Sequence, residues 1–248
     1  MNRILLALVF AATVLPAQGA SIVSGLSQDQ IQISSTYTGT EIAIFGVIEG
    51  ADYSEGSRYD VAVVLRGPDT DMVVRKKDRV VGLWINRDQA RLGLPAFYYL
   101  AASRPLNSIA PAFTLDRYGV GLQNLRADRI VSHHDPEPFR KALIQQLTDE
   151  GLYHETFTNV EFLSNMSFRV RVPIPAGVAR GQYNAEVYLF RNGAVEAAQS
   201  TPLFIDQIGM ERRIFNLAHQ WPVFYGLGAV LMAGLLGWLS SIVFRRPQ

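Results

Sequence analysis

The chain has 248 residues, a formal net charge of +1 at pH 7 and no cysteine. The absence of cysteine excludes disulfides, thiol nucleophiles, iron–sulfur clusters and cysteine-ligated zinc, and the near-zero charge argues against a nucleic-acid-binding surface. Two apolar segments flank a body of about 200 residues, which is long enough for one large or two small domains.

The first apolar segment has the layout of a secretory signal peptide. Arg3 supplies a positive start, residues 4–15 form an apolar stretch, and the small residues Ala17 and Gly19 follow. The apolar stretch is too short to cross a bilayer by itself. We therefore expect this segment to export the body and to be cleaved. The alternative is an N-terminal anchor that is retained.

Strand-like patterns begin after this segment and dominate the body. Residues 41–48 and 59–66 are rich in β-branched and aromatic side chains, and residues 166–172 alternate apolar and polar side chains, as half-buried strands do. Asn192-Gly193, between two further runs, is the strongest short-range signal of a β-hairpin. Tyr183, at the entry to that hairpin, is similar to the tyrosine that hydrogen-bonds back to the backbone in immunoglobulin-like sandwiches. We predict a mainly β fold, an immunoglobulin-like β-sandwich. Two small sandwiches joined by helices are the alternative.

The most distinctive charged segment is Arg-Lys-Lys-Asp-Arg at residues 75–79. Strand-like runs at residues 72–75 and 80–85 predict a hairpin with a basic tip between them. Such a tip suits recognition of an anionic solute, a lipid headgroup or an acidic partner. The alternative is that charges at the tip keep a sheet edge soluble and that the nearby tryptophan belongs to the core. The candidate patch consists of Arg75, Lys76, Lys77, Arg79 and Trp84.

A helical insert at about residues 107–150 interrupts the strands. Its clearest helix covers residues 135–150, with Asp135 capping the first turn and Gly151 in the left-handed position after the last turn. Because its apolar residues recur at four-residue spacing, this helix is expected to cover another part of the fold. The stripe consists of Phe139, Leu143 and Leu147.

The second apolar segment, residues 222–244, contains no Asp, Glu, Lys or Arg and is followed by Arg245 and Arg246. At ~1.5 Å per residue such a helix spans roughly 34 Å, enough to cross a bilayer core with some tilt. With an exported N-terminus it acts as a stop-transfer helix of the bacterial inner membrane, and its two arginines stay in the cytoplasm. The expected order is signal peptide, periplasmic body, juxtamembrane segment, span and cytoplasmic tail, at residues 1–19, 20–206, 207–221, 222–244 and 245–248.

Small side chains recur every four residues on one face of the expected span. They are Ala229, Ala233, Gly237 and Ser241. Such stripes let helix backbones approach closely in lipid. This face therefore predicts packing against another integral membrane protein or a second copy of the chain. A chance pattern in a span rich in Gly and Ala is the alternative.

No catalytic motif occurs in the chain. It has no Gly-x-Ser-x-Gly elbow, no Ser-x-x-Lys and no phosphate-binding glycine loop. His133-His134-Asp135 offers metal-ligating residue types, yet adjacent histidines rarely bind one ion together and Asp135 is already placed as a helix cap. We assign no catalytic residue, metal or cofactor and expect a non-enzymatic protein. An unrecognised hydrolase is less favoured.

Stretches spread over nearly the whole chain resemble a family of transmembrane proteins of unknown function from Alphaproteobacteria. The similar pieces are Tyr37-Thr38-Gly39-Thr40-Glu41, Phe45-Gly46, Val64-Leu65-Arg66-Gly67-Pro68, Val74-Arg75-Lys76-Lys77, Gly82-Leu83-Trp84-Ile85-Asn86, Gly151-Leu152-Tyr153 and Phe244-Arg245-Arg246. The resemblance implies a signal peptide, an exported body and one C-terminal span, and it brings no catalytic residues. It also implies genes that often neighbour permeases of the sulfite/sulfonate exporter type.

Together these features predict an inner-membrane-anchored periplasmic accessory or docking partner of another membrane protein, such as a permease. The alternative is a periplasmic module that binds an anion or an acidic polymer.

Overall fold

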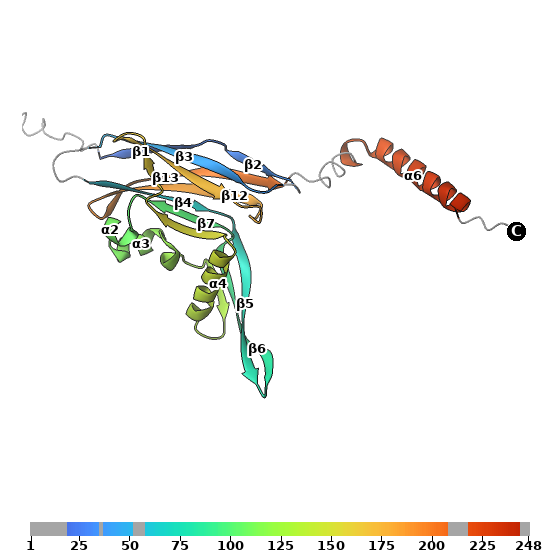
Figure 1. Ribbon diagram of the computed structural model, residues 1–248, viewed down its shortest axis with the longest axis horizontal. Helices are drawn as coiled ribbons and strands as arrows, with labels where there is room; N and C mark the ends of the chain where they lie inside the picture. The colour runs from blue at the N-terminus through green and yellow to red at the C-terminus, as the bar shows by residue number, and fades with distance from the viewer. Residues whose placement is uncertain (1–18, 35–36, 52–57, 208–217, 244–248) are drawn as a thin grey trace, which may run out of the picture. The chain divides into compact units, whose positions relative to one another are not determined.

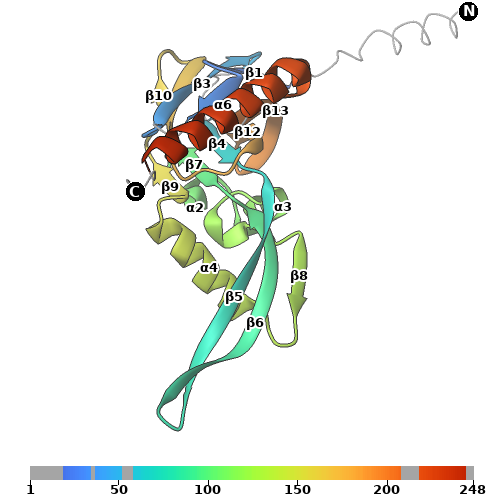
Figure 2. The same cartoon turned by 90° about the vertical axis from the view of Figure 1, so that its right-hand side faces the viewer.

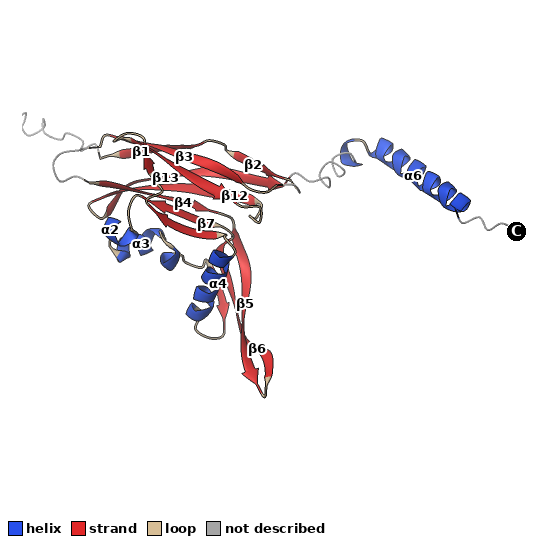
Figure 3. Ribbon diagram, in the orientation of Figure 1, coloured by secondary structure: helices blue, strands red, loops and turns tan. Residues whose placement is uncertain are grey.

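The computed structural model describes residues 19–34, 37–51, 58–207 and 218–243 (Figure 1). The chain divides into two compact units. One, called the body below, holds nearly all of the strands and the short helices. The other contains helix α6 (Pro222–Val243). Strands dominate the body (Figure 3), which confirms the predicted mainly β fold with a C-terminal apolar helix.

Thirteen strands are described and form three sheets. They are β1 (Ser21–Leu26), β2 (Gln30–Ile33), β3 (Thr40–Glu49), β4 (Tyr59–Arg66), β5 (Asp69–Val80), β6 (Leu83–Pro95), β7 (Tyr98–Ala102), β8 (Arg129–Ser132), β9 (Tyr153–Phe157), β10 (Glu161–Phe162), β11 (Ser167–Ile174), β12 (Gly181–Arg191) and β13 (Ala194–Gln207). The strand orders are β1-β3-β11-β10, β2-β13-β12-β4-β7-β9 and β5-β6-β8.

The four-stranded sheet lies over one face of the six-stranded sheet (Figure 1). Phe168, Val170 and Val172 of β11 are buried, as their alternation predicts, whereas Met166 just before the strand is exposed. The Tyr183 hydroxyl donates a 2.6 Å hydrogen bond to the Ala179 carbonyl. This contact confirms the predicted tyrosine corner.

The β12–β13 hairpin turns at Asn192 and Gly193, as predicted. Their φ angles are 49° and 85°. Two consecutive positive φ angles are what a two-residue hairpin turn with the right twist requires, and Asn-Gly adopts them at low cost. This turn fixes the register from Arg191 opposite Ala194 along the hairpin.

A helical layer covers the other face of the six-stranded sheet. It contains α2 (Leu106–Ile109), α3 (Ala112–Tyr118), the 3₁₀ turn η1 (Leu122–Asn124) and α4 (Glu137–Asp149). These elements lie between β7 and β9, which pair in parallel. Since two parallel strands need a long crossover connection, the insert is the segment that carries the chain back to start β9.

Helix α4 has the ends and the apolar stripe that the sequence predicts. The Asp135 carboxylate accepts a 3.1 Å hydrogen bond from the Glu137 amide, and Gly151 has a φ of 72°. The stripe is buried in one cluster with β4 and β7. Strands β4 and β7 are therefore covered on both faces, and this explains why they are apolar almost throughout.

Strand β1 is an element that the sequence analysis did not predict. It pairs with β3 in antiparallel register, from Ser21 opposite Glu49 to Leu26 opposite Ile44. Its residues include serine and glycine, which weaken a strand pattern. The expected signal peptide before it is residues 1–19, and all of it except Gly19 lies outside the described part of the chain.

Candidate functional site: the β5–β6 arm

Strands β5 and β6 form a long hairpin whose distal half leaves the body (Figure 2). Strand β8 pairs with β6 only from Ala90 to Gly93. Beyond Ala90 the two hairpin strands pair only with each other, and we call residues 75–89 the arm. Within it, every side chain that the structure describes is exposed or half-buried.

The tip of the arm is apolar, and the predicted basic tip is wrong. The chain turns at Val81 and Gly82, with φ angles of 50° and 85°, so Lys76, Lys77 and Asp78 lie inside β5. Gly82 supplies the positive φ that a two-residue turn needs, and lysine is readily accepted on exposed strands. The exposed fractions are 98% for Val81, 71% for Leu83 and 69% for Trp84. The alternative of Trp84 as a core residue is therefore also wrong.

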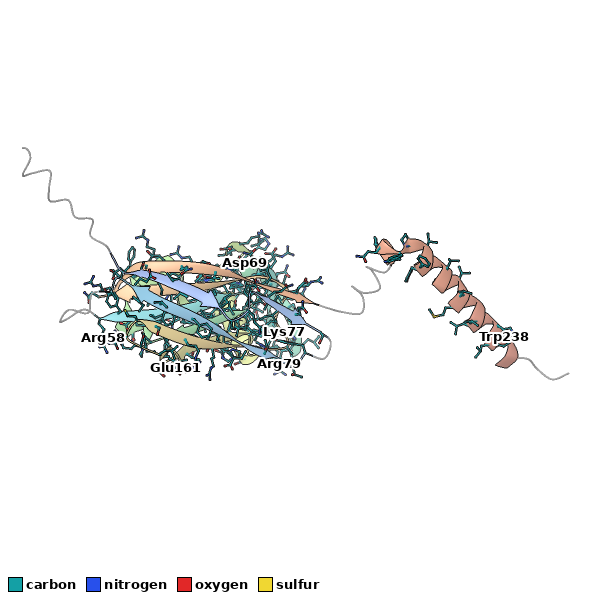
Figure 4. The ribbon with its side chains drawn as sticks, turned by 90° about the horizontal axis from the view of Figure 1, so that it is seen from above. Arg58, Asp69, Lys77, Arg79, Glu161 and Trp238 are labelled. Atoms are coloured by element: carbon teal, nitrogen blue, oxygen red, sulfur yellow. The ribbon has the colours of Figure 1, made fainter. Side chains whose placement is uncertain are left out.

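Cross-strand pairing places cations on one face of the arm. Arg75 pairs with Gln89, Lys77 with Asn86, and Arg79 with Trp84. Residues directly opposite in an antiparallel pair share a face. We call these six residues the cationic face. It carries no carboxylate, and Lys77 and Arg79 are labelled in Figure 4.

The opposite face of the arm holds its carboxylates. Lys76 pairs with Asp88, and Asp78 pairs with Ile85. The Lys76 ammonium lies 3.7 Å from an Asp78 carboxylate oxygen. Because side chains alternate along a strand, the carboxylates lie on one face of the arm with Lys76, and the cationic face lies on the other. On the cationic face, Arg75, Lys77 and Arg79 have no ion-pair partner among the described residues.

A β-bulge in the middle of the arm opens a cavity of about 450 Å³. Lys76 pairs with Asp88 and Lys77 with Asn86, so Arg87 has no residue opposite it. Bulges of this kind bend a strand and redirect a side chain. The cavity is lined by Arg75, Asn86, Arg87, Asp88, Gln89, His133 and His134.

The loop after β8 brings the two histidines to this cavity. The Ser132 hydroxyl donates a 2.8 Å hydrogen bond to the His134 carbonyl and lies 3.3 Å from the His134 amide. The His134 Nδ1 atom lies 3.4 Å from a carboxylate oxygen of Asp88. Within the described residues no group of three or more His, Cys, Asp or Glu side chains is placed to hold a metal ion.

Several charged groups elsewhere in the body are engaged within the fold. Asp60 is bound by the Arg104 guanidinium, with Nε 2.7 Å from Oδ1, and by the Ser103 hydroxyl at 2.9 Å. Arg66 donates a 3.0 Å hydrogen bond to Glu186. These contacts hold strands and loops together, so we assign them to stability.

Two larger cavities in the body each include polar side chains that are bound within the fold. One, of about 650 Å³, includes Glu161 and Arg169, which form a 2.7 Å ion pair. The other, of about 540 Å³, lies beside α2 and α3 and includes Glu155, whose carboxylate accepts a hydrogen bond from the Leu122 amide. In the arm cavity, Arg75 and Arg87 have no such partner among the described residues.

Over residues 21–246 the chain matches the model of a family described as "Putative transmembrane protein (Alph_Pro_TM)". The chain belongs to this family. The match confirms the resemblance seen in the sequence. A search of curated proteins finds no match. As a member of this family the chain is a membrane protein, and the arm belongs to a body that is attached to a membrane.

Helix α6 contains a candidate membrane span. The stretch Pro222–Ser240 is 19 residues long with a mean hydropathy of 1.7, enough to cross a membrane by length and composition, and none of it is buried. Ala229, Ala233 and Gly237 lie within this stretch. Ser241 lies in the same helix, but its side chain is outside the described set. The predicted packing face on these residues stays a prediction.

The arm cavity includes residues that sequence reasoning did not connect. Of the predicted patch only Arg75 lines the cavity, while Lys77, Arg79 and Trp84 lie further along the cationic face. Arg87 reaches the cavity through a bulge, and the histidines reach it through the pairing of β6 with β8. The basic character of residues 75–91 was the signal available in the sequence.

Proposed function

We propose that this protein is an inner-membrane-anchored, non-enzymatic periplasmic accessory protein that docks on another integral membrane protein, such as a permease. The observation that carries the proposal is the arm. Its apolar tip at Val81, Leu83 and Trp84 is exposed, although nothing in the fold requires apolar residues there. Exposed apolar groups at the end of a projecting element are typical of contact surfaces.

The chemistry of the arm describes the expected partner. Fully burying an apolar side chain contributes roughly 1.5–3 kcal/mol, and a tryptophan at the centre of an interface often dominates the binding energy. The cationic face adds Arg75, Lys77 and Arg79 behind this tip. The complementary surface is therefore an apolar pocket with acidic residues along one side.

Attachment to the membrane favours a partner in the same membrane. The body and α6 belong to one chain, so α6 keeps the body at the membrane. Covalent attachment of this kind raises the effective concentration of the body toward neighbouring membrane proteins. The small-residue face of Ala229, Ala233 and Gly237 offers a second contact within the bilayer.

The periplasmic location rests on the export signal expected in residues 1–19 and on the two arginines after the span. The cysteine-free chain makes this testable with single-cysteine variants. In intact cells, an impermeant maleimide should label Leu83→Cys, and it should label Gln248→Cys only after lysis. The reverse pattern would place the body in the cytoplasm.

Photo-crosslinking in native membranes tests the docking. The photoreactive amino acid p-benzoylphenylalanine replaces Trp84 in the full-length protein, and the matched control replaces Phe113, which is 76% exposed on α3. We expect one membrane-protein adduct from position 84 and none from position 113. Adducts with lipid alone, or the same adducts from both positions, would rule out docking through the arm.

A further inference from the structure

Beyond docking, we propose that the arm cavity is a binding site for a phosphate-type oxyanion. Arg75 from β5, Arg87 from the β6 bulge and the His133-His134 loop after β8 converge on one cavity of about 450 Å³. Three segments that are separate in the sequence contribute to it. The inference is independent of the docking proposal, because it rests on the middle of the arm and not on its tip.

The charge balance of the cavity favours an anion. Asp88 is the one carboxylate that lines it, and one of its oxygens faces the His134 imidazole at 3.4 Å. Arg75 and Arg87 have no hydrogen-bond or ion-pair partner among the described residues. Since arginine is always charged in proteins, two unpaired positive charges face the cavity against one carboxylate that is already in contact with a histidine.

The residue types identify the class of anion. A guanidinium presents its N–H donors in a planar fork that matches two oxygens of a phosphate or sulfate. The amide groups of Asn86 and Gln89 and the imidazole of His133 add neutral donors around the same space. A cavity of about 450 Å³ also exceeds the size of inorganic phosphate. A phosphate ester or the phosphate of a lipid headgroup therefore fits the same chemistry.

Local geometry positions the backbone segments that carry these donors. The bulge leaves Arg87 without a cross-strand partner and directs it away from the regular ladder. The Ser132 hydroxyl binds both the carbonyl and the amide of His134 and so fixes the turn that carries the histidines. A fixed turn at the histidines lowers part of the ordering cost of binding.

Phosphate titration of the full-length protein tests the site. The protein is placed in phosphatidylcholine nanodiscs, and binding of inorganic phosphate is followed by isothermal titration calorimetry at constant ionic strength. The test variant is Arg75→Gln with Arg87→Gln. The matched control, Lys77→Gln with Arg79→Gln, removes the same charge from the same arm but spares the cavity.

We expect saturable binding that the test variant weakens at least ~10-fold, about the loss of one charge-assisted hydrogen bond, while the control stays within about 2-fold. Equal weakening in both variants would show screening of a general positive charge and overturn the site. Absence of saturable binding in the unmodified protein would overturn it as well. Unchanged thermal unfolding of the test variant excludes a folding defect.

Nanodiscs with phosphatidylglycerol identify the source of the phosphate. If a lipid headgroup occupies the cavity, phosphatidylglycerol should abolish the calorimetric signal, and a spin label at Val131→Cys, which is exposed on β8 beside the cavity, should lose mobility only in those discs. If the ligand is a free solute, binding of inorganic phosphate should be the same in both lipids. Either result supports the oxyanion site and assigns its ligand.

Discussion

Strands β4 and β5 are neighbours in the sequence but lie in opposite environments. In β4 the residues from Asp60 to Leu65 are all buried, because the four-stranded sheet covers one face and the helical layer covers the other. The distal half of β5 pairs only with β6, and its side chains from Arg75 to Arg79 are exposed or half-buried. Burial therefore dictates the sequence of β4, whereas the folded body places no such demand on the arm.

The largest expected difference between the two regions is in stability. Leu65 in β4 is 0% exposed and Leu83 in the arm is 71% exposed. Leu65→Ala should lower the free energy of unfolding by about 2–5 kcal/mol, because it leaves a cavity in the core. Leu83→Ala should change it by less than about 0.5 kcal/mol. Urea denaturation of both variants in detergent measures this. Similar losses in the two would mean that the arm contributes to the core.

The second prediction concerns binding to the partner, which should depend on the arm and not on the core. Trp84→Ala should weaken co-purification with the docking partner by about 2 kcal/mol or more, as expected for a tryptophan at the centre of an interface. The same change should leave thermal unfolding unaltered, since Trp84 is 69% exposed. Quantitative affinity capture from solubilised membranes measures the effect. Phe113→Ala is the control, and equal loss in both would contradict a role specific to the arm.

The third prediction compares a buried carboxylate of the body with a half-buried carboxylate of the arm. The Asp60 side chain is 8% exposed and paired with Arg104, whereas the Asp78 side chain is 29% exposed and lies 3.7 Å from the Lys76 ammonium. Asp60→Asn should cost about 1–3 kcal/mol of folding free energy, because it weakens a charge-assisted network. Asp78→Asn should cost less than about 0.5 kcal/mol. Thermal unfolding distinguishes the two, and equal shifts would contradict the assignment of Asp60 to stability.

The smallest expected effect lies at Asp69, where β5 begins. Partial desolvation and a hydrogen bond with the Asp128 carboxyl raise the pKa of Asp69. Below about pH 4, the usual pKa of aspartate, the group is protonated in both the folded and the unfolded chain and costs nothing. As the pH rises through the folded-state pKa, ionisation is opposed only in the folded protein, so stability falls.

Asp69→Asn should remove this loss. The variant should be more stable than the unmodified protein at pH 7 by about 0.5 kcal/mol, a value that allows for solvent screening, and the two should be equally stable at pH 3. Unfolding curves at both pH values provide the measurement. A variant that is less stable at pH 7 would contradict the raised pKa.

Elements with local signals could be predicted from the sequence. The Asn192-Gly193 turn and the Asp135 and Gly151 ends of α4 depend on a few adjacent residues, and the structure has them where expected. Strand β1 could not be predicted in the same way, because it becomes a strand through its pairing with β3. The tip was misplaced because charged residues were taken as turn formers, although an exposed strand accepts them.

The candidate site was predictable only in part. The run at residues 75–79 shows in the sequence that this region is basic. Which of its charges share a face depends on register, and the register contains a bulge at Arg87. The approach of His133 and His134 depends on the pairing of β6 with β8. Non-local pairing and a single extra residue therefore decided the composition of the cavity.

The short contact between β8 and β6 has a consequence for motion. A two-stranded ribbon is marginally stable by itself, and the pairing with β8 ends at Ala90. We expect the arm to open and close as a unit of its own, with amide hydrogens at residues 75–89 exchanging with deuterium long before those of β4. Slower exchange in the arm would then report whatever molecule holds its two strands together.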